Sequence, residues 1–452
     1  MSMCVPAERF RASPPCLQWW TDARFGVSFH FGLYSLPARG EWVRSAERMT
    51  VEQYGRYFEA FNPDRYDPAS WARLCRAAGM KYAILTAKHH DGFCLFDTAL
   101  TGYKSTNTPA RRDLIREYVD AFRAQGIHVG LYYSLVDWHH PDYPAFGDRQ
   151  HPLRDDPAER DRPVRWDNYV RYLHGQVREL LTNYGKIDLL AFDFSYGEFT
   201  GDRWGAAELV RMIRELQPDI VLNDRLSHAT AGNLKSVPSP AWAGDFDTCE
   251  LNTPHQPTTD DAGKILPWDL WITHNNSWCF GASDTAWKSS GDIIRALVNC
   301  VSKSGNLTLN FGPTARGELP WQSTELLKEV ATWMSQNAAS IHQCGMAPLE
   351  RPDWGRWTLR NDGKVLYAHV MEQPMGHLTL RSLRGKVASP THLPTGADAY
   401  LTDFWNPGVQ SFGRPDDVFM NLHKPVAHTH RWPDPFDTVV ALRVTDAAST
   451  TG

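Results

Sequence analysis

The sequence predicts an α/β protein in which a (β/α)8-like barrel is followed by a small C-terminal antiparallel β-sandwich. Apolar, β-rich runs alternate with helical patterns over the first three quarters of the 452 residues, which indicates parallel strands joined by right-handed crossovers. This many units in roughly 340 residues favour a closed barrel over an open doubly wound sheet. No GxGxxG motif and no phosphate loop supports the open sheet.

The barrel pattern ends near residue 345. Four short alternating runs follow, separated by Gly, Pro and Asp: 363–371, 377–383, 398–404 and 437–444. Such runs are typical of antiparallel strands that bury one face in a sandwich. We therefore expect a barrel domain over residues 1–345 and a β-sandwich over residues 346–452.

Six segments of the barrel region are predicted strands, because each is a largely apolar run. They are 24–32, 82–87, 128–135, 187–195, 219–225 and 306–313. Six further segments repeat apolar residues at helical spacing. They are 70–80, 113–126, 169–184, 206–216, 291–305 and 323–341. Residues 226–268 show neither pattern, so we expect long irregular loops there and an imperfect barrel on that side.

Polar side chains follow the predicted strands where the strands end. The five groups are His30; Lys88, His89, His90 and Asp91; Tyr132, Tyr133 and Ser134; Asp193; and Asn223, Asp224 and Arg225. In a barrel the C-terminal ends of the strands meet at one rim, where the active site forms. A lone buried polar residue is usually a satisfied core group, but five coincident groups indicate a pocket lined by donors and acceptors.

The two adjacent histidines raise the question of a metal. Neighbouring residues on an extended strand point to opposite faces, so His89 and His90 cannot easily bind one ion. The sequence also has no HExxH pair. We therefore expect no metal and favour a polyhydroxyl ligand, bonded by the imidazoles, Lys88 and Arg225 and stacked on aromatic rings.

Composition excludes several classes of partner. The 47 Lys and Arg against 52 Asp and Glu give a formal charge of −5 and no basic stripe, which argues against nucleic acid. No apolar run is long enough to span a membrane. The first twenty residues lack a signal pattern, and the eight cysteines form no CxxC pair. We expect a cytoplasmic protein with reduced thiols, and export of a processed form is the alternative.

Six segments together resemble the α-L-fucosidase family, glycoside hydrolase family 29. They are ARFGVSFHFGLYSLPARGEWV, AKHHDGFCLFDT, GLYYSLVDWHHPDY, NDR, SWCFG and VSKSGNLTLNFGPTARGELP, in this order across about residues 19–340. The resemblance implies a barrel with a C-terminal β-sandwich. It also implies retaining hydrolysis of α-L-fucosides on fucosylated oligosaccharides, without a metal or other cofactor.

The resemblance assigns roles to individual residues. Asp193 is the expected nucleophile, with a structural ion pair to Arg225 as the alternative. Glu250, in GDFDTCELNTP, is the expected acid/base, and Asp269 is its rival. The expected fucose contacts are His30, Glu41, Trp42, His89, His90, Tyr133, Arg225 and Asp269, with Trp278 and Phe280 as an aromatic wall under the C6 methyl.

Two positions depart from the family pattern. Ala191 stands where the family usually has Trp, and Trp268-Asp269 stands where it has Trp-Glu. The first change could enlarge the pocket, unless Phe192, Phe194 or another aromatic refills the space. The alternatives to a fucosidase are therefore a retaining enzyme for another glycoside, such as an α-L-galactoside, or an inactive barrel that only binds glycans.

Overall fold

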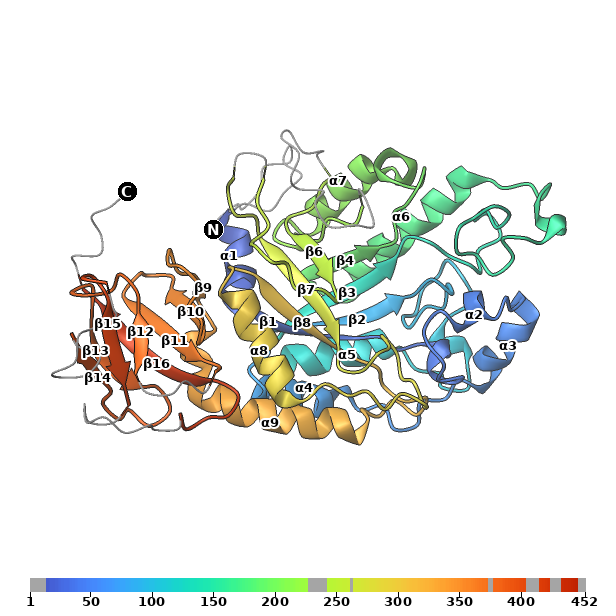
Figure 1. Ribbon diagram of the computed structural model, residues 1–452. Coiled ribbons are helices and arrows are strands. Elements are labelled where there is room, and N and C mark those ends of the chain that lie inside the picture. Colours follow the sequence, from blue (N-terminus) through green and yellow to red (C-terminus); the bar gives the residue numbers. More distant parts are fainter. Residues whose placement is uncertain are drawn as a thin grey trace.

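The computed structural model describes residues 14–226, 242–260, 263–372, 377–403, 414–422 and 432–445. Eight parallel strands form one curled sheet in the order β5-β4-β3-β2-β1-β8-β7-β6 (Figure 1). They are β1 (Phe25–Phe29), β2 (Tyr82–Lys88), β3 (His128–Ser134), β4 (Leu189–Asp193), β5 (Val221–Leu222), β6 (Asp247–Glu250), β7 (Trp268–Thr273) and β8 (Asn306–Phe311). One parallel bridge, between Asn223 and Phe246, joins the two edges. The predicted barrel-like fold is confirmed.

Helices lie around the curled sheet (Figure 1). They are α1 (Pro14–Ala23), α2 (Val43–Ala46), α3 (Val51–Ala60), α4 (Pro68–Ala77), α5 (Leu114–Ala124), α6 (Trp166–Asn183), α7 (Ala206–Leu216), α8 (Ser290–Val301) and α9 (Trp321–Asn337). Several begin at side-chain caps that satisfy free backbone N–H groups. Asp113, for example, accepts from the N–H of Arg116 at the start of α5.

The expectation of irregular loops over residues 226–268 is wrong in one part. Strand β6 lies within this range and pairs in parallel with β7. Its sequence, Asp-Thr-Cys-Glu, is short and polar, so no apolar run marks it. Asp269 similarly interrupts the apolar run of β7, although every residue of that strand is buried. Pairing with neighbouring strands therefore makes these segments strands although their own residues have only a weak preference for β-structure.

Large side chains fill the inside of the barrel. Trp20 of α1 stacks on Phe246, with ring centroids 4.3 Å apart, and both are fully buried. Tyr82 of β2 lies in the same interior cluster. A Cβ atom at Gly26 would lie 2.2 Å from the ring of Tyr82, so the neighbouring strand β1 needs glycine at this point. The interior is thus a packed core, and open space is left only at a rim.

The C-terminal region contains two antiparallel sheets beside the barrel (Figure 1). The five-stranded sheet has the order β13-β16-β11-β10-β9, and the three-stranded sheet has the order β12-β15-β14. The strands are β9 (Cys344–Met346), β10 (Gly355–Arg360), β11 (Val365–Val370), β12 (Leu378–Leu380), β13 (Val387–His392), β14 (Tyr400–Thr402), β15 (Val418–Asn421) and β16 (Thr438–Val444). The two sheets share a separate buried apolar cluster, as a sandwich does.

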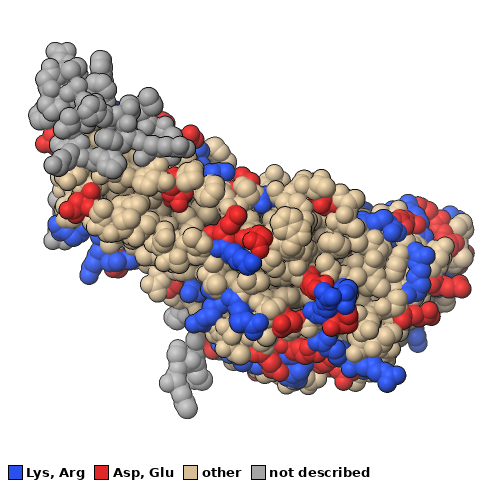
Figure 2. Space-filling view, turned by 90° about the horizontal axis from the view of Figure 1, so that it is seen from below, with Lys and Arg blue, Asp and Glu red and all other residues tan. Residues whose placement is uncertain are grey.

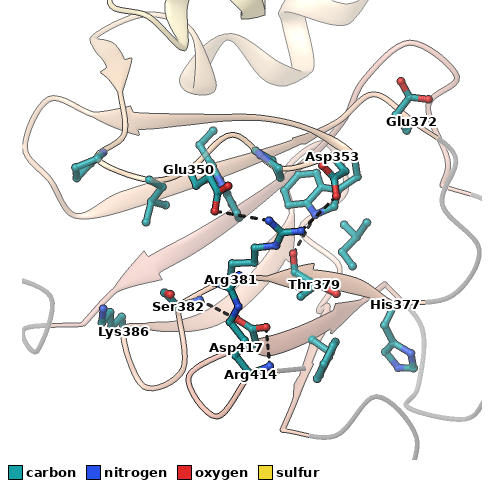
Figure 3. Close-up of a pocket in the computed structure, with 17 residues that line it drawn as sticks. Glu350, Asp353, Glu372, His377, Thr379, Arg381, Ser382, Lys386, Arg414 and Asp417 are labelled. Carbon is teal, nitrogen blue, oxygen red and sulfur yellow. Dashed lines mark hydrogen bonds and ion pairs between the residues drawn. The ribbon is translucent and has the colours of Figure 1, made fainter. Parts of the chain in front are cut away.

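A cleft of about 740 Å³ lies in this C-terminal region. Its acidic and basic side chains neutralise one another: Arg381 pairs with Glu350 at 3.6 Å and with Asp353 at 3.4 Å (Figure 3). Among its described lining residues no buried side-chain polar atom lacks a partner. The cleft therefore has the character of a solvated surface groove.

The surface mixes charges of both signs, as Figure 2 shows for one face of the molecule. No helix in the described part of the chain is long and apolar enough to cross a membrane. Six cysteines in the described ranges are free, five of them buried. Cys16 is disulfide-bonded, so the expectation that all the thiols are reduced is wrong.

A buried histidine links the sandwich to the barrel. His369 of β11 lies 2.7 Å from Asp437 through Nδ1 and 3.0 Å from the Thr358 hydroxyl through Nε2. Thr358 donates to the carbonyl of Ser340, and Trp333 of α9 donates to the carbonyl of Asp437. The imidazole thus connects groups from both regions.

We predict that His369→Ala destabilises the protein by about 3–5 kcal/mol, because it leaves the buried Asp437 carboxyl without its partner. Urea unfolding followed by tryptophan fluorescence measures the change. The control is His377→Ala, which removes a partly exposed histidine of the same region and should change stability by less than about 0.5 kcal/mol. Equal effects of the two substitutions would show that the buried contact adds nothing.

Candidate active site

A pocket of about 340 Å³ lies at the rim formed by the C-terminal ends of the barrel strands. Its lining comes from strand ends and from the loops that follow them. The residues are His30, Glu41, Trp42, His89, His90, Tyr132, Arg149, Gln150, Ala191, Phe192, Asp193, Phe194, Tyr196, Asn223, Arg225, Thr248, Glu250, Trp271 and Trp278. Nine of the twelve residues proposed from the sequence are among them.

Asp193 is the last residue of β4 and faces the pocket. Its Oδ2 accepts a hydrogen bond of 2.8 Å from the Tyr132 hydroxyl, and its Oδ1 lies 3.5 Å from Arg225 Nη1. Burial raises the pKa of Asp193 to about 6, and the nearby Glu250 adds to the rise, while Arg225 and Tyr132 oppose it. The carboxylate is therefore ionised at neutral pH but sits in a poorly hydrated place.

Arg225 brings the second carboxylate to the same point. Its Nη2 lies 2.6 Å from Glu250 Oε1, and its other terminal nitrogen faces Asp193. Glu250 ends β6, and 40% of its side chain is exposed to the pocket mouth, against 19% for Asp193. One guanidinium thus holds a sheltered and an accessible carboxylate on its two sides.

The two adjacent histidines both face the pocket, so the expectation that they point to opposite faces is wrong. Strand β2 ends at Lys88, and the chain turns at once: the N–H of Gly92 donates to the carbonyl of His89. The two rings lie 4.0 Å apart. Burial lowers the pKa of both imidazoles well below the usual value, so they are neutral hydrogen-bonding groups at pH 7.

A third imidazole and three aromatic rings complete the walls. His30 Nδ1 lies 2.7 Å from Asn310 Oδ1, and burial lowers its pKa to about 4. Trp278 lies 5.2 Å from the His30 ring, and Trp42 lies 5.2 Å from the His90 ring. Phe194 packs against His90 at 4.7 Å. Polar groups and flat apolar faces alternate around the pocket, as a sugar ring requires.

Glu41 is almost buried beside the Trp278 loop. Its Oε2 accepts a long hydrogen bond of 3.4 Å from Ser277, and burial raises the pKa of its carboxyl. Among the described residues no group of three or more His, Cys, Asp or Glu is placed to hold a metal ion.

Three predicted contacts do not line the pocket. Tyr133 points to the outer side of the sheet, where its hydroxyl donates to Gln176 of α6 at 2.8 Å, and its neighbour Tyr132 faces the pocket instead. Phe280 lines a different cleft, near Trp321. Asp269 is fully buried inside the barrel. The predictions of direct sugar contact by Tyr133, Phe280 and Asp269 are therefore wrong for this pocket.

Several lining residues were not predicted as sugar contacts. Tyr132 could have been found by strand alternation once β3 was aligned with Asp193, because side chains on a strand alternate between faces. Trp271 lies on β7, which had no strand signal. Arg149 and Gln150 lie in the loop region between β3 and α6, and no local sequence pattern identifies them as pocket residues.

A barrel rim with two carboxylates, neutral imidazoles and aromatic walls defines the site of a glycoside hydrolase. The sequence model of the α-L-fucosidase family matches residues 6–339. The chain therefore belongs to the α-L-fucosidase family.

Solved structures and curated sequences agree with this assignment. Isoenzyme 1 of the α-L-fucosidase from Paenibacillus thiaminolyticus is 51% identical, with a TM-score of 0.90 over 95% of this chain and 99% of that one. A Bacteroides thetaiotaomicron family 29 α-L-fucosidase, trapped as a covalent intermediate, is 26% identical, with a TM-score of 0.81 over 96% and 97% of the chains. The plasma α-L-fucosidase of Rattus norvegicus is 25% identical over 95% of this chain and 91% of its own length.

We predict that Tyr132→Phe moves the acid limb of kcat/KM on a fucoside to higher pH. Activity that requires the ionised Asp193 carboxylate falls as pH drops through the pKa of this group, about 6. Loss of the hydroxyl that stabilises the carboxylate should raise this value by about one pH unit.

The matched control is Tyr133→Phe, which removes the hydroxyl of the neighbouring tyrosine from a bond to Gln176. This substitution should not change the pH at which kcat/KM falls on the acid side. The pH profiles of the two variants decide the matter: equal limbs would mean that Tyr132 does not set the ionisation of Asp193.

Proposed function

We propose that this protein hydrolyses terminal α-L-fucosides with retention of configuration, through a covalent glycosyl-aspartate intermediate on Asp193. The observation that carries the proposal is the pair of carboxylates held on one guanidinium at the barrel rim. Two carboxylates on one guanidinium suit double displacement, for which the two groups stand about 5 Å apart, rather than inversion, which needs room for a water molecule. The trapped intermediate of the Bacteroides relative supports the same route.

We assign a role to each carboxylate from its surroundings. Asp193 is sheltered and fixed by Tyr132 and Arg225, as suits a nucleophile that attacks the anomeric carbon. Glu250 is the more exposed group, as suits a residue that exchanges protons with the leaving group and with water. In the first step Glu250 protonates the glycosidic oxygen while Asp193 forms the ester. In the second step Glu250 takes a proton from water, which attacks the anomeric carbon and releases Asp193.

Asp269 is a poor candidate for this proton transfer. Its carboxyl lies inside the barrel, where Oδ2 accepts from Thr308 at 2.7 Å and from the Trp271 indole at 3.0 Å. A general acid must reach the leaving oxygen directly or through one water. Glu250 lines the pocket and Asp269 does not.

The pocket fits a neutral sugar at the non-reducing end of a fucosylated oligosaccharide. The alternative of an α-L-galactoside depends on space for one more hydroxyl near Ala191. Comparison of nitrophenyl α-L-fucoside with the matching α-L-galactoside discriminates the two substrates. A barrel that only binds glycans would hydrolyse neither.

We predict that Asp193→Ala abolishes turnover of nitrophenyl α-L-fucoside while the thermal unfolding midpoint stays close to that of the wild type. Azide should restore turnover and give a fucosyl azide, because a small anion can occupy the space of the lost carboxylate. Product analysis by NMR and mass spectrometry checks this. A variant that keeps near-normal turnover would exclude Asp193 as the nucleophile.

We predict that Glu250→Ala loses far more activity on a natural fucosyl linkage than on a nitrophenyl fucoside, because nitrophenol leaves without full protonation. The loss on the natural linkage should be about 10²-fold or more. Azide should accelerate turnover of the nitrophenyl substrate. Asp269→Ala is the comparison variant, and it should slow both substrates alike. The reverse pattern in the two variants would exchange the assigned roles.

A further inference from the structure

A chain of hydrogen bonds leads from the pocket into the loop after β3. His90 Nδ1 lies 2.7 Å from Ser134 Oγ, and Ser134 Oγ lies 2.8 Å from the carbonyl oxygen of Val136. Ser134 is fully buried, and His90 is 1% exposed. The donors and acceptors in these two contacts determine which atoms of His90 and Ser134 carry protons.

The protons in this chain can be counted. A carbonyl oxygen only accepts, so the single proton of the Ser134 hydroxyl lies on its contact with Val136. Ser134 Oγ must then accept from His90 Nδ1–H. A neutral imidazole carries one N–H, and burial keeps His90 neutral by lowering its pKa. The other ring nitrogen, Nε2, therefore carries no proton. It lies 3.9 Å from Asp193 Oδ2.

We propose that Ser134 is a positioning residue that fixes the Nδ1–H tautomer of His90, so that Nε2 accepts a hydrogen bond from a hydroxyl of the bound sugar. The identity of the sugar as a fucoside rests on the proposed function. The tautomer itself does not depend on it.

The fixed tautomer has two consequences at the reaction centre. The sugar hydroxyl that contacts His90 must donate a hydrogen bond to Nε2. A sugar that carries a non-donating substituent in place of this hydroxyl should therefore bind less well. The bare Nε2 also cannot donate to Asp193. The opposite tautomer would turn an N–H toward Oδ2, where it would compete with the Tyr132 hydroxyl and draw charge from the nucleophile.

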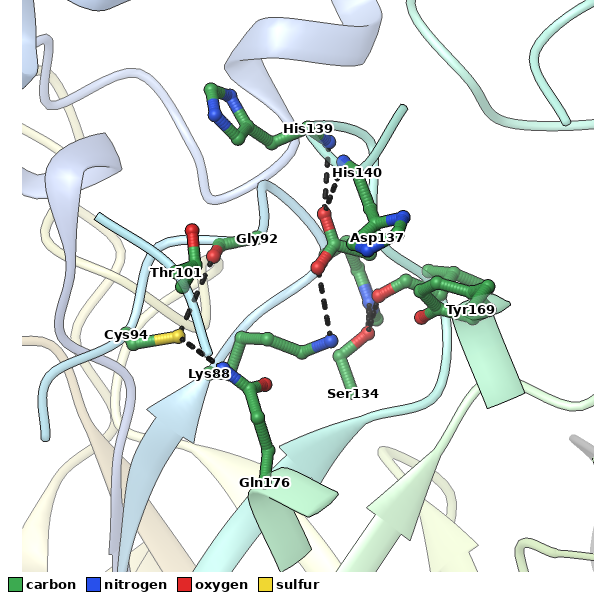
Figure 4. Close-up of polar contacts among 12 residues, drawn as sticks. Lys88, Gly92, Cys94, Thr101, Ser134, Asp137, His139, His140, Tyr169 and Gln176 are labelled. Atoms are coloured by element: carbon green, nitrogen blue, oxygen red, sulfur yellow. Dashed lines mark hydrogen bonds and ion pairs between the residues drawn. The ribbon is translucent and has the colours of Figure 1, made fainter. Parts of the chain in front are cut away.

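A buried ion pair fixes Asp137, the residue that follows Val136. Lys88 Nζ lies 3.2 Å from Asp137 Oδ2, and neither side chain is more than 1% exposed. Asp137 Oδ1 accepts from the backbone N–H groups of His139 and His140, each at 2.9 Å (Figure 4). Because Lys88 directly precedes the histidine pair, this contact ties the end of β2 to the loop after β3.

Further contacts fix the same loop against the histidine. The N–H of Trp138 donates to the carbonyl of His90 at 2.8 Å. Lys88 Nζ also lies 4.5 Å from the centre of the Tyr133 ring. We expected Lys88 and Tyr133 to contact the sugar. In the structure they instead help to fix the loop that contacts His90.

The direct test is NMR of protein labelled with 15N-histidine, because the protonated and bare nitrogens of a neutral imidazole resonate far apart. His90 is assigned by the signals that His90→Gln removes. The wild type should show a protonated Nδ1 and a bare Nε2. Ser134→Ala should shift His90 toward the opposite tautomer or a mixture.

The matched control is Ser105→Ala. Ser105 is also fully buried, and its hydroxyl donates to the carbonyls of Leu95 and Arg112 rather than meeting a histidine. Ser105→Ala should leave the His90 signals unchanged. A protonated Nε2 in the wild type would overturn the proposal, and this readout does not require Ser134→Ala to fold.

Kinetics identify the hydroxyl that His90 accepts from. Ser134→Ala should lower kcat/KM on nitrophenyl α-L-fucoside by about 10-fold, the loss of one well-placed hydrogen bond. The 3-deoxy-3-fluoro and 4-deoxy-4-fluoro fucosides each carry fluorine in place of one hydroxyl, at C3 or at C4. Fluorine has no proton to donate to His90. On the analogue that lacks the cognate hydroxyl, wild type and variant should react equally. An equal loss on every substrate would overturn the proposal. If the wild type cleaves no fucoside, the proposed function fails, and the NMR measurement still decides the tautomer.

Discussion

The active site depends on the contact between one guanidinium and two carboxylates that come from opposite edges of the sheet. Asp193 ends β4, next to the edge strand β5, and Glu250 ends β6, the other edge. Between these edges the strand ladder is reduced to one bridge. Side chains replace the missing ladder: Asp245 accepts from the N–H of Leu222 at 2.8 Å, and Asp224 accepts from the N–H of Thr248 at 3.2 Å. Arg225 continues this seam of polar contacts into the pocket, so closure of the barrel and alignment of the carboxylates have one structural origin.

Burial acts in opposite directions on the ionisable groups around this seam. It raises the pKa of Asp193 and lowers the pKa values of His30, His89 and His90, because it disfavours the charged form of each group. At neutral pH the histidines are uncharged, and the positive charge at the reaction centre comes from Arg225. A neutral ligand can therefore replace water at the imidazoles without desolvating a charged group, while Asp193 keeps its ionic partner Arg225.

The apolar runs of the sequence were enough to predict the central strands β1 to β4 and β8, because burial on both faces demands continuous apolar residues. The same rule fails at β6, whose polar residues serve the pocket and the seam. Strand alternation was applied to His89 and His90 one residue too far, beyond the end of β2 at Lys88. At Tyr132 and Tyr133 only the register with β4 tells which ring faces inward. Local pattern therefore located the rim, but pairing between distant segments decided which side chains line it.

The two departures from the family pattern are connected through the barrel interior. Ala191 packs in the same buried cluster as Tyr132 and Trp271, so the small side chain on β4 lies among aromatic rings from β3 and β7. Asp269 holds the Trp271 indole by its N–H, at 3.0 Å, and also accepts from the Thr308 hydroxyl. Burial raises the pKa of Asp269 to about 7, although the hydrogen bonds that it accepts from Thr308, Tyr82 and Trp271 oppose the rise. A carboxylate one methylene shorter than glutamate thus orients an indole at the pocket floor. The space around Ala191 is therefore shaped by Trp271, two positions beyond Asp269, on a strand that carries neither Asp193 nor Glu250.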